Sequence, residues 1–253
     1  MTAVRSLPHA ADTPPHTATR TRILRGLTVI TLIAVAVGLF TALVTAGMDA
    51  EQGNVQRIFY VHVSAFAGAF IALGATVIGG LAYLRTRNIK WDTFALAGVE
   101  VGFALALVNL ITGSIWARPI WNTWWTWDPR LTSAAIMVLT YAAYLMLRSG
   151  IENAETRRRF ASVYGILAYV TVIITLIIIR IRPDTIHPAV IGASPQNAEG
   201  GFGLTPSMIT AMTVNMVVWS VFIPITLMWW RIRIENLAQR VQAKRLQVLE
   251  AEK

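Results

Sequence analysis

The sequence predicts an all-α membrane protein with six transmembrane helices and both termini in the cytoplasm. Three observations support this fold class: a high share of hydrophobic residues, their grouping into six long runs, and the distribution of basic residues between those runs. Hydrophobic residues make up 55% of the 253-residue chain and charged residues only 14%, whereas ordinary soluble domains carry about 25% charged residues. The composition is therefore typical of a membrane protein.

The six apolar runs are each close to the roughly 20 residues that a helix needs to cross a bilayer. They cover about residues 26–47, 58–84, 93–115, 131–147, 160–180 and 207–230. The first run is longer than the roughly 7–15 apolar residues of a secretory signal peptide, so we interpret it as a retained helix.

We divide the chain into a membrane domain and two tails. Residues 1–19 are polar and contain three prolines, which favours a flexible cytoplasmic tail. Residues 20–230 form the six-helix membrane domain. Residues 231–253 mix apolar side chains with charges, and this pattern predicts an amphipathic cytoplasmic tail that contacts the membrane surface or a partner.

The positions of the basic residues predict the orientation of the helices. Seventeen of the 22 Lys and Arg residues lie in the two ends of the chain and in every second connection. By the positive-inside rule these parts are cytoplasmic, and the stretches 48–57, 116–130 and 181–206 face outward. The net charge of +9 follows from these topology determinants, so we expect no nucleic-acid partner. The long stretch 181–206 is rich in Gly and Pro, and we expect it to act as a lid.

Tryptophan is concentrated in the second outward stretch, 116–130. Five of the nine tryptophans fall within twelve residues there: Trp116, Trp121, Trp124, Trp125 and Trp127. One or two indoles are enough to anchor a helix at the membrane interface. We therefore interpret the five as an aromatic shelf for a large flat ligand.

Two histidines also fall on the outward side. His62 lies about one turn into the second apolar run, and His187 lies in the long outer stretch. Neutral imidazole is a common iron ligand, and haem accepts one or two axial histidines. Either histidine alone could be structural, but their coincidence with the tryptophans predicts that both bind the iron of haem b.

Charged side chains beside these residues suit the carboxylates of such a ligand. Guanidinium groups bind carboxylates in a bidentate manner, and the candidates are Arg57, Arg118, Arg130 and Arg182. The alternative is that arginines at helix ends extend to lipid headgroups. Asp128, followed by a proline, is typical of a helix N-cap, and we expect it to fix the fourth helix beside the shelf.

One carboxylate lies inside a hydrophobic run. Glu100 falls within the third run, and an ionisable group there is a functional candidate by default. It pairs with Asn109, Thr112 or a partner helix, or it is protonated; the sequence leaves these alternatives open.

Residues 114–133 resemble the signature of the haem-handling protein family, a tryptophan-rich external loop that ends in Trp-Asp. Within that family the chain is most similar to the cytochrome c maturation protein C branch of haem exporters. Residues 57–63 and 185–188 are similar to the family's segments around its two external histidines. Two departures occur: Asn122 replaces the usual glycine, and Arg182-Pro183 stands where tryptophans are frequent.

The resemblance implies a function and a set of partners. Such proteins hold haem outside the membrane between the tryptophan loop and two axial histidines, here His62 and His187, with Asp128 completing the motif. The implied partners are haem, ABC-type transporter subunits, a small single-pass membrane subunit and a membrane-anchored haem chaperone. The implied location is the bacterial inner membrane, with the site facing the periplasm and serving c-type cytochrome biogenesis. Whether such a positioning device counts as an enzyme stays open.

Other functions are alternatives to this interpretation. A synthetase-type haem handler of the same family is usually longer, with additional helices. An electron-transfer subunit with b-type haems requires histidine pairs inside the helices. A zinc enzyme would use a motif such as His-Glu-x-x-His, and a simple permease would leave the outward histidines and tryptophans unexplained.

Overall fold

The computed structural model describes residues 15–182, 184–188 and 203–251. Among these residues, six helices are long and apolar enough to cross a membrane. They are Thr19–Thr45, Asn54–Thr86, Ile89–Trp121, Pro129–Gly150, Ala154–Ile181 and Pro206–Ala251. The part of the chain that the structure describes contains no β-strand, so the predicted all-α fold with six membrane-spanning helices is confirmed.

The helices follow one another in antiparallel order. α1 (Pro15–Phe40) continues into a short π-helix, η1 (Thr41–Thr45), and a 3-10 turn, η2 (Asn54–Arg57), leads into α2 (Ile58–Thr86). The next helices are α3 (Ile89–Trp121), α4 (Pro129–Gly150) and α5 (Ala154–Ile181). The last span is one continuous helix made of α6 (Pro206–Val217), the π-helical turn η3 (Val218–Phe222) and α7 (Ile223–Ala251).

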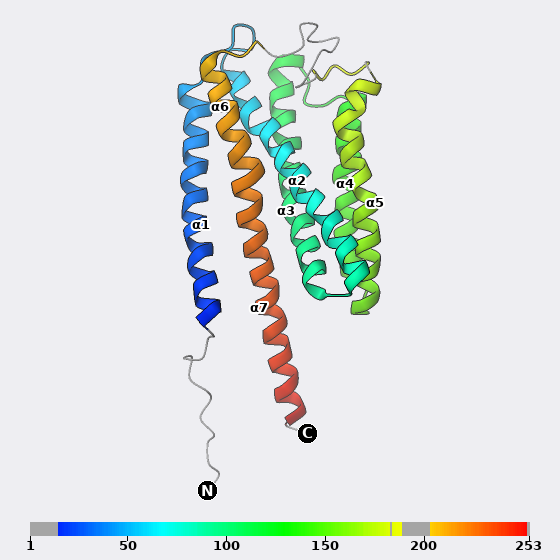
Figure 1. Ribbon diagram of the computed structural model, residues 1–253. Helices are drawn as coiled ribbons and strands as arrows, with labels where there is room; N and C mark the ends of the chain where they lie inside the picture. The colour runs from blue at the N-terminus through cyan, green and yellow to red at the C-terminus, as the bar shows by residue number, and fades with distance from the viewer. Residues whose placement is uncertain (1–14, 183, 189–202, 252–253) are drawn as a thin grey trace.

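Helices α2 to α5 lie together, and α1 packs beside the α6–α7 helix along one side of them (Figure 1). α1 begins and α7 ends at the same end of the bundle, and α7 continues well past the ends of its neighbours. The start of α2, the end of α3 and the start of α4 meet at the opposite end, which we call the site end.

Small residues bring α2 and α3 into close contact. A Cβ atom added to Gly98 would lie 2.6 Å from the carbonyl oxygen of Ala72, and one added to Gly79 would lie 2.8 Å from that of Trp91. Only glycine permits this approach of the two backbones, which is how helices pack inside membranes. The pair thus forms a rigid support for the residues at the site end.

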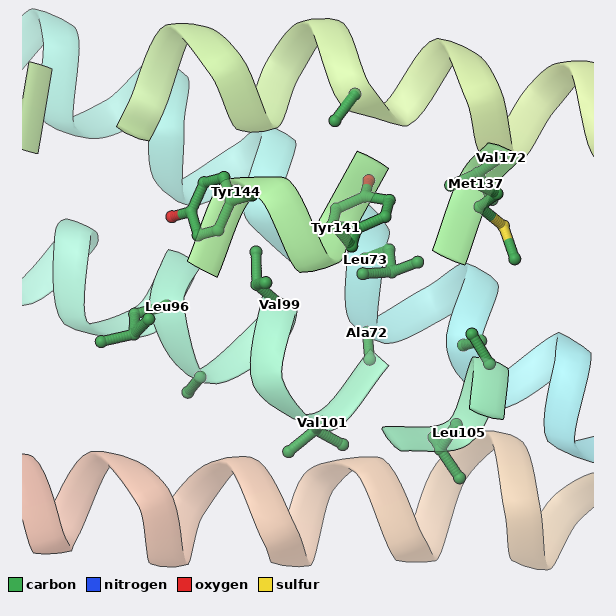
Figure 2. Close-up of a cluster of buried hydrophobic side chains, with 14 of the residues drawn as sticks. Ala72, Leu73, Leu96, Val99, Val101, Leu105, Met137, Tyr141, Tyr144 and Val172 are labelled. Carbon is green, nitrogen blue, oxygen red and sulfur yellow. The ribbon is translucent and has the colours of Figure 1, made fainter. Parts of the chain in front are cut away.

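The main apolar core lies between α2, α3, α4 and α5 (Figure 2). Tyr141 and Tyr144 of α4 are fully buried against side chains of the neighbouring helices. The same cluster includes Leu73, Val99, Leu105 and Val172. The core holds α4 in place and therefore fixes the position of its first turn, which belongs to the site end.

A buried ion pair stabilises the end of the bundle that lies away from the site. The carboxylate of Asp92 accepts two hydrogen bonds from Arg148, of 2.7 and 2.6 Å, and Arg158 lies 3.7 Å away. Asp92 is only 4% exposed. These contacts join α3 to α4 and α5.

Glu100 pairs with Arg231 of α7, which also contacts Glu235 at 2.9 Å. Asn109 and Thr112, two of the partners that the sequence left open for Glu100, contact His62 instead. The carboxylate thus forms an interhelical ion pair between α3 and α7.

Two boundaries differ from those that the sequence suggests. α3 extends to Trp121, so the first two tryptophans of the stretch 116–130 are helical rather than part of a loop. Pro119 lies in the last turn of this helix, and the helix ends at Trp121, before the C-cap Asn122, whose φ of 55° is left-handed. At the other end of the chain, residues 231–251 continue α7 without a break.

The polar N-terminal tail expected at residues 1–19 is described only from Pro15, where α1 begins. Of the lid expected at residues 181–206, the structure describes 181–182, 184–188 and 203–206. The remainder of both segments lies outside the described residues.

Candidate functional site

A cavity of about 740 Å³ opens at the site end of the bundle. This volume lies within the range of about 300–1,000 Å³ that is typical of small-molecule and cofactor sites. Its walls come from the start of α2, the end of α3, the start of α4 and the segment after α5. They include Gln52, Gln56, Phe59, His62, Asn109, Gly113, Trp116, Trp121, Trp125, Arg130, Ile186, His187 and Leu204.

His62 is held firmly on α2. Its Nδ1 lies 2.9 Å from the backbone oxygen of Asn109 and 3.3 Å from the hydroxyl of Thr112. The side-chain amide of Asn109 donates to the backbone oxygen of His62 at 2.9 Å and lies 3.5 Å from its Nε2. A carbonyl oxygen can only accept, so Nδ1 carries a proton, and in the neutral ring the lone pair is on Nε2. Histidines that bind metals commonly show this arrangement.

His187 repeats this arrangement in the segment that follows α5. Its Nδ1 donates to the backbone oxygen of Pro188 at 2.8 Å, which again leaves the lone pair on Nε2. Burial by the surrounding protein, together with the nearby charge of Arg130, lowers the pKa of His187 to about 3. The imidazole is therefore neutral at physiological pH and able to bind a metal without first losing a proton.

The two imidazoles come together in the cavity. Their ring centroids are 6.2 Å apart, and the ring planes are inclined by 37°. Two imidazoles bound to one metal atom from opposite sides would have centroids about 6.3 Å apart, since a metal–nitrogen bond of about 2.0–2.1 Å adds to a ring radius of about 1.1 Å on each side. The observed ring spacing is close to this value.

Three of the five predicted shelf tryptophans line the cavity, and two of them meet the histidines edge-on. Trp116 meets His62 edge-on at 5.8 Å, and Trp121 meets His187 edge-on at 6.3 Å. The Nε1 of Trp116 donates to Gln52 at 2.9 Å. The buried Nε1 of Trp125 has no hydrogen-bond partner among the described residues.

The other two indoles point elsewhere. Trp124 is 57% exposed and Trp127 is 76% exposed, and neither lines the cavity. Trp127 packs edge-on against Trp125, with ring centroids 5.7 Å apart, and lines a shallow depression between α4 and α5 together with Ile136 and Ile174. The aromatic cluster therefore has an inner part (Trp116, Trp121 and Trp125) and an outer part (Trp124 and Trp127).

Of the four candidate arginines, only Arg130 lines the cavity. Its guanidinium lies 4.9 Å from the centre of the Phe66 ring, and its buried Nη1 has no hydrogen-bond partner in the part of the chain that is described. The other three contact protein groups: Arg57 donates to the backbone oxygen of Leu43, Arg118 to that of Asn122, and Arg182 to the carboxylate of Asp184.

Asp128 is the N-cap of α4, as the sequence predicts. It accepts hydrogen bonds from the backbone N–H groups of Arg130 at 2.9 Å and Leu131 at 3.4 Å. The same carboxylate accepts from the hydroxyls of Thr126 at 2.9 Å and Thr185 at 2.6 Å. Asp128 is not part of the cavity wall.

Sequence reasoning missed several residues of the site. Asn109 and Gly113 of α3 surround the His62 ring, and a Cβ added to Gly113 would lie 2.7 Å from its Cε1. Gln52 and Gln56 also line the cavity. One available signal was the cost of an amide in an apolar helix, which marks Asn109 as a residue with a specific partner.

The fold and the cavity define a class: a polytopic membrane protein that holds two neutral imidazoles as a pair at one end of its helical bundle. Comparison with known sequences identifies the family. The chain belongs to the Heme exporter protein C family, whose model matches residues 7–247.

Individual relatives agree with this assignment. The chain is 32% identical to Heme exporter protein C of Bradyrhizobium diazoefficiens over 235 residues, which cover 91% of this chain and 84% of the relative. It is 34% identical to Heme exporter protein C of Rhodobacter capsulatus over 149 residues, covering 59% and 60% of the two chains. A ccmC-like mitochondrial protein of cytochrome c biosynthesis from Arabidopsis thaliana is 36% identical over 114 residues, covering 45% and 44%.

Proposed function

We propose that this protein binds haem b at the site end, on the extracytoplasmic side of the bacterial inner membrane, and presents it for c-type cytochrome biogenesis. The observation that carries the proposal is the spacing of the two neutral imidazoles, whose centroids are 6.2 Å apart and whose Nδ1 atoms are both engaged by backbone carbonyls. In this proposal the Nε2 atoms of His62 and His187 bind the iron.

The remaining wall of the cavity fits the rest of such a molecule. Its indole and phenyl groups offer an apolar surface to a flat macrocycle. Two buried hydrogen-bond donors in the same wall, Nη1 of Arg130 and Nε1 of Trp125, have no partner among the described residues. Leaving a buried donor unpaired costs about 1–3 kcal/mol, so both favour a ligand that brings an acceptor. A carboxylate of haem is such an acceptor.

In this proposal the protein acts by positioning its cargo. The two histidines fix the iron, Trp116 and Trp121 restrict the movement of the histidine rings, and Arg130 orients the molecule through a carboxylate. No bond of the haem is broken by the protein itself. This is the contribution expected of a delivery component rather than of an enzyme.

The names of the family and of the relatives refer to haem export and to cytochrome c biosynthesis, and they support a complex with other subunits of that process; the partners named next are part of our proposal. They are ABC-type transporter subunits, a small single-pass membrane subunit and a membrane-anchored haem chaperone that receives the haem. The outer tryptophans, Trp124 and Trp127, are exposed beside the site, and we include them in the surface offered to the chaperone. Arg57, Arg118 and Arg182, although engaged with protein groups here, lie at the same end and belong to that surface.

Absorption spectroscopy of the purified protein in detergent tests the proposal. The wild-type protein should show the sharp spectrum of six-coordinate low-spin haem with two nitrogen ligands. His62→Gly and His187→Gly should each lose this spectrum, and added imidazole should restore it by occupying the space of the missing ring. A haem spectrum that neither variant alters would refute the assignment of the ligands.

A further inference from the structure

We infer that Asp128 is a positioning residue, which holds His187 in place through the hydroxyl of Thr185. The inference rests on the proposed function, because it assigns Asp128 to the placement of an iron ligand. The inference gives Asp128 a role different from that of the tryptophans of the same motif. Asp128 does not contact the haem itself but acts through His187.

The hydrogen bonds around Asp128 have only one possible direction. An ionised carboxylate can only accept, so the Thr185 hydroxyl donates its proton to Asp128 Oδ1 over 2.6 Å. The oxygen of that hydroxyl then accepts the backbone N–H of His187 at 3.2 Å. The hydrogen bonds therefore run in one direction: the backbone N–H of His187 donates to Thr185, and the hydroxyl of Thr185 donates to Asp128.

His187 needs such support more than His62 does. His62 lies on a helix and is enclosed by Asn109 and Gly113 of the neighbouring helix. His187 lies in the non-helical segment after α5, which ends at Ile181. The bond from Thr185 to Asp128 joins this segment to the first turn of α4, and Thr185 is only 3% exposed.

Asp128, at the other end of this series of hydrogen bonds, is itself held in place. Asp128 caps α4 through the backbone N–H groups of Arg130 and Leu131, and Thr126 donates to its second oxygen. Arg130 itself lines the cavity. One carboxylate therefore places the second histidine relative to the same helical turn that carries the cavity's arginine. Support of this kind fixes the orientation of metal ligands in many proteins.

The test uses variants that preserve the cap of α4. Thr185→Val keeps the shape of the side chain and removes the hydroxyl, whereas Thr185→Ser keeps the hydroxyl. We expect Thr185→Val to weaken haem binding by about tenfold or more and to convert part of the low-spin spectrum into a five-coordinate high-spin one. Thr185→Ser should restore the wild-type spectrum.

A second variant removes the same hydrogen bond by changing its acceptor, Asp128. Asp128→Ser retains an N-cap side chain but is too short to bridge to Thr185. It should reproduce the spectral change of Thr185→Val, and the double variant should lose no more than either single variant, because both remove one interaction. Additive losses would contradict the inference, since they would mean that the two residues act separately.

A measurement on the haem-free protein tests the inference without requiring that haem be bound. Diethyl pyrocarbonate modifies accessible neutral imidazoles, and mass spectrometry locates the product. In Thr185→Val, His187 should react several times faster than in the wild type, while the reaction of His62 should be unchanged. Equal rates at His187 would overturn the inference.

The outcomes distinguish this inference from the proposed function. If His187→Gly alters the haem spectrum but Thr185→Val and Asp128→Ser do not, His187 is a ligand and Asp128 does not position it. If His187→Gly itself leaves the spectrum unchanged, the proposed function fails, and the inference fails with it.

Discussion

Gly113 of α3 provides the space that the imidazole of His62 occupies. A Cβ atom at this position would lie 2.7 Å from Cε1 and 3.2 Å from Nδ1 of the ring, both closer than normal contacts allow. The ring cannot retreat easily, because Asn109 holds its Nδ1 and Trp116 lies against it. The placement of one candidate ligand therefore depends on the absence of a side chain on another helix.

We predict that Gly113→Ala displaces His62 and weakens haem binding by at least tenfold, while the helices remain assembled. The measurement is haem titration followed by absorption, together with thermal unfolding in detergent. Gly150→Ala is the matched control, because an added Cβ there meets nothing within 4 Å. Equal haem affinity in both variants would show that the ring does not bind where we place it.

The division of the tryptophans into inner and outer parts predicts different effects of the same substitution. Trp125→Ala removes an indole from the cavity wall, and we expect about tenfold weaker haem retention, equivalent to ~1.4 kcal/mol. Trp127→Ala removes an indole that is 76% exposed and outside the cavity, so retention should stay within about twofold of the wild type.

A more conservative substitution distinguishes the contribution of the Trp125 ring to haem binding from that of its N–H group. Trp125→Phe keeps an aromatic surface but removes the donor, and its haem affinity should fall between those of the wild type and Trp125→Ala. If Trp127→Ala lowers retention as much as Trp125→Ala does, the distinction between the inner and outer tryptophans is wrong.

Arg130 should recognise a carboxylate of the haem. Hydrogen bonds to charged groups contribute about 1.5–3 kcal/mol, so Arg130→Gln should weaken the binding of haem by about 10- to 100-fold. The dimethyl ester of haem has no free carboxylate, and its binding should be nearly the same in the wild type and in Arg130→Gln. Comparison of the two ligands by titration isolates this contact.

Arg182→Gln is the control for Arg130, because Arg182 pairs with Asp184 and does not line the cavity. It should bind haem and the dimethyl ester with the affinity of the wild type. An equal loss of both ligands in Arg130→Gln would mean that the arginine supports the shape of the cavity rather than a carboxylate.

The buried ion pair at the end opposite the site should affect stability but not haem binding directly. Asp92→Asn leaves Arg148 without its countercharge, and breaking a buried pair in this way costs about 3–5 kcal/mol. Denaturation in mixed micelles measures the loss. Glu155→Gln removes an exposed pair with Arg159, and its effect should stay below about 1 kcal/mol. Similar losses in both variants would contradict the importance of burial.

The sequence was sufficient to predict the helices and to single out the two histidines that the structure brings together. A bilayer requires about 20 apolar residues in each span, so six runs lead directly to six helices. Imidazole is rare in this chain and has a specific chemistry, so His62 and His187 could be singled out before their distance was known. The N-cap role of Asp128 is equally local, since it depends only on the residues next to it.

Tertiary contacts decided the features that could not be predicted. Five indoles in twelve residues gave no indication of which would line the cavity, since this depends on where α3 ends and on how its end packs: Trp116 and Trp121 line the cavity from the last turns of α3. Four arginines were equivalent in the sequence, yet three find protein partners and only Arg130 reaches the cavity. Thr185 could not be connected to Asp128, since 57 positions separate them in the chain.

The last membrane-spanning helix is much longer than a bilayer requires. From Pro206 to Ala251 it is one unbroken rod, about 70 Å long at 1.5 Å per residue, and its far portion stands clear of the other helices (Figure 1). Leu204, two residues before the rod begins, lines the cavity. The same span therefore connects a residue next to the cavity directly with the helical portion that stands clear at the opposite end of the bundle.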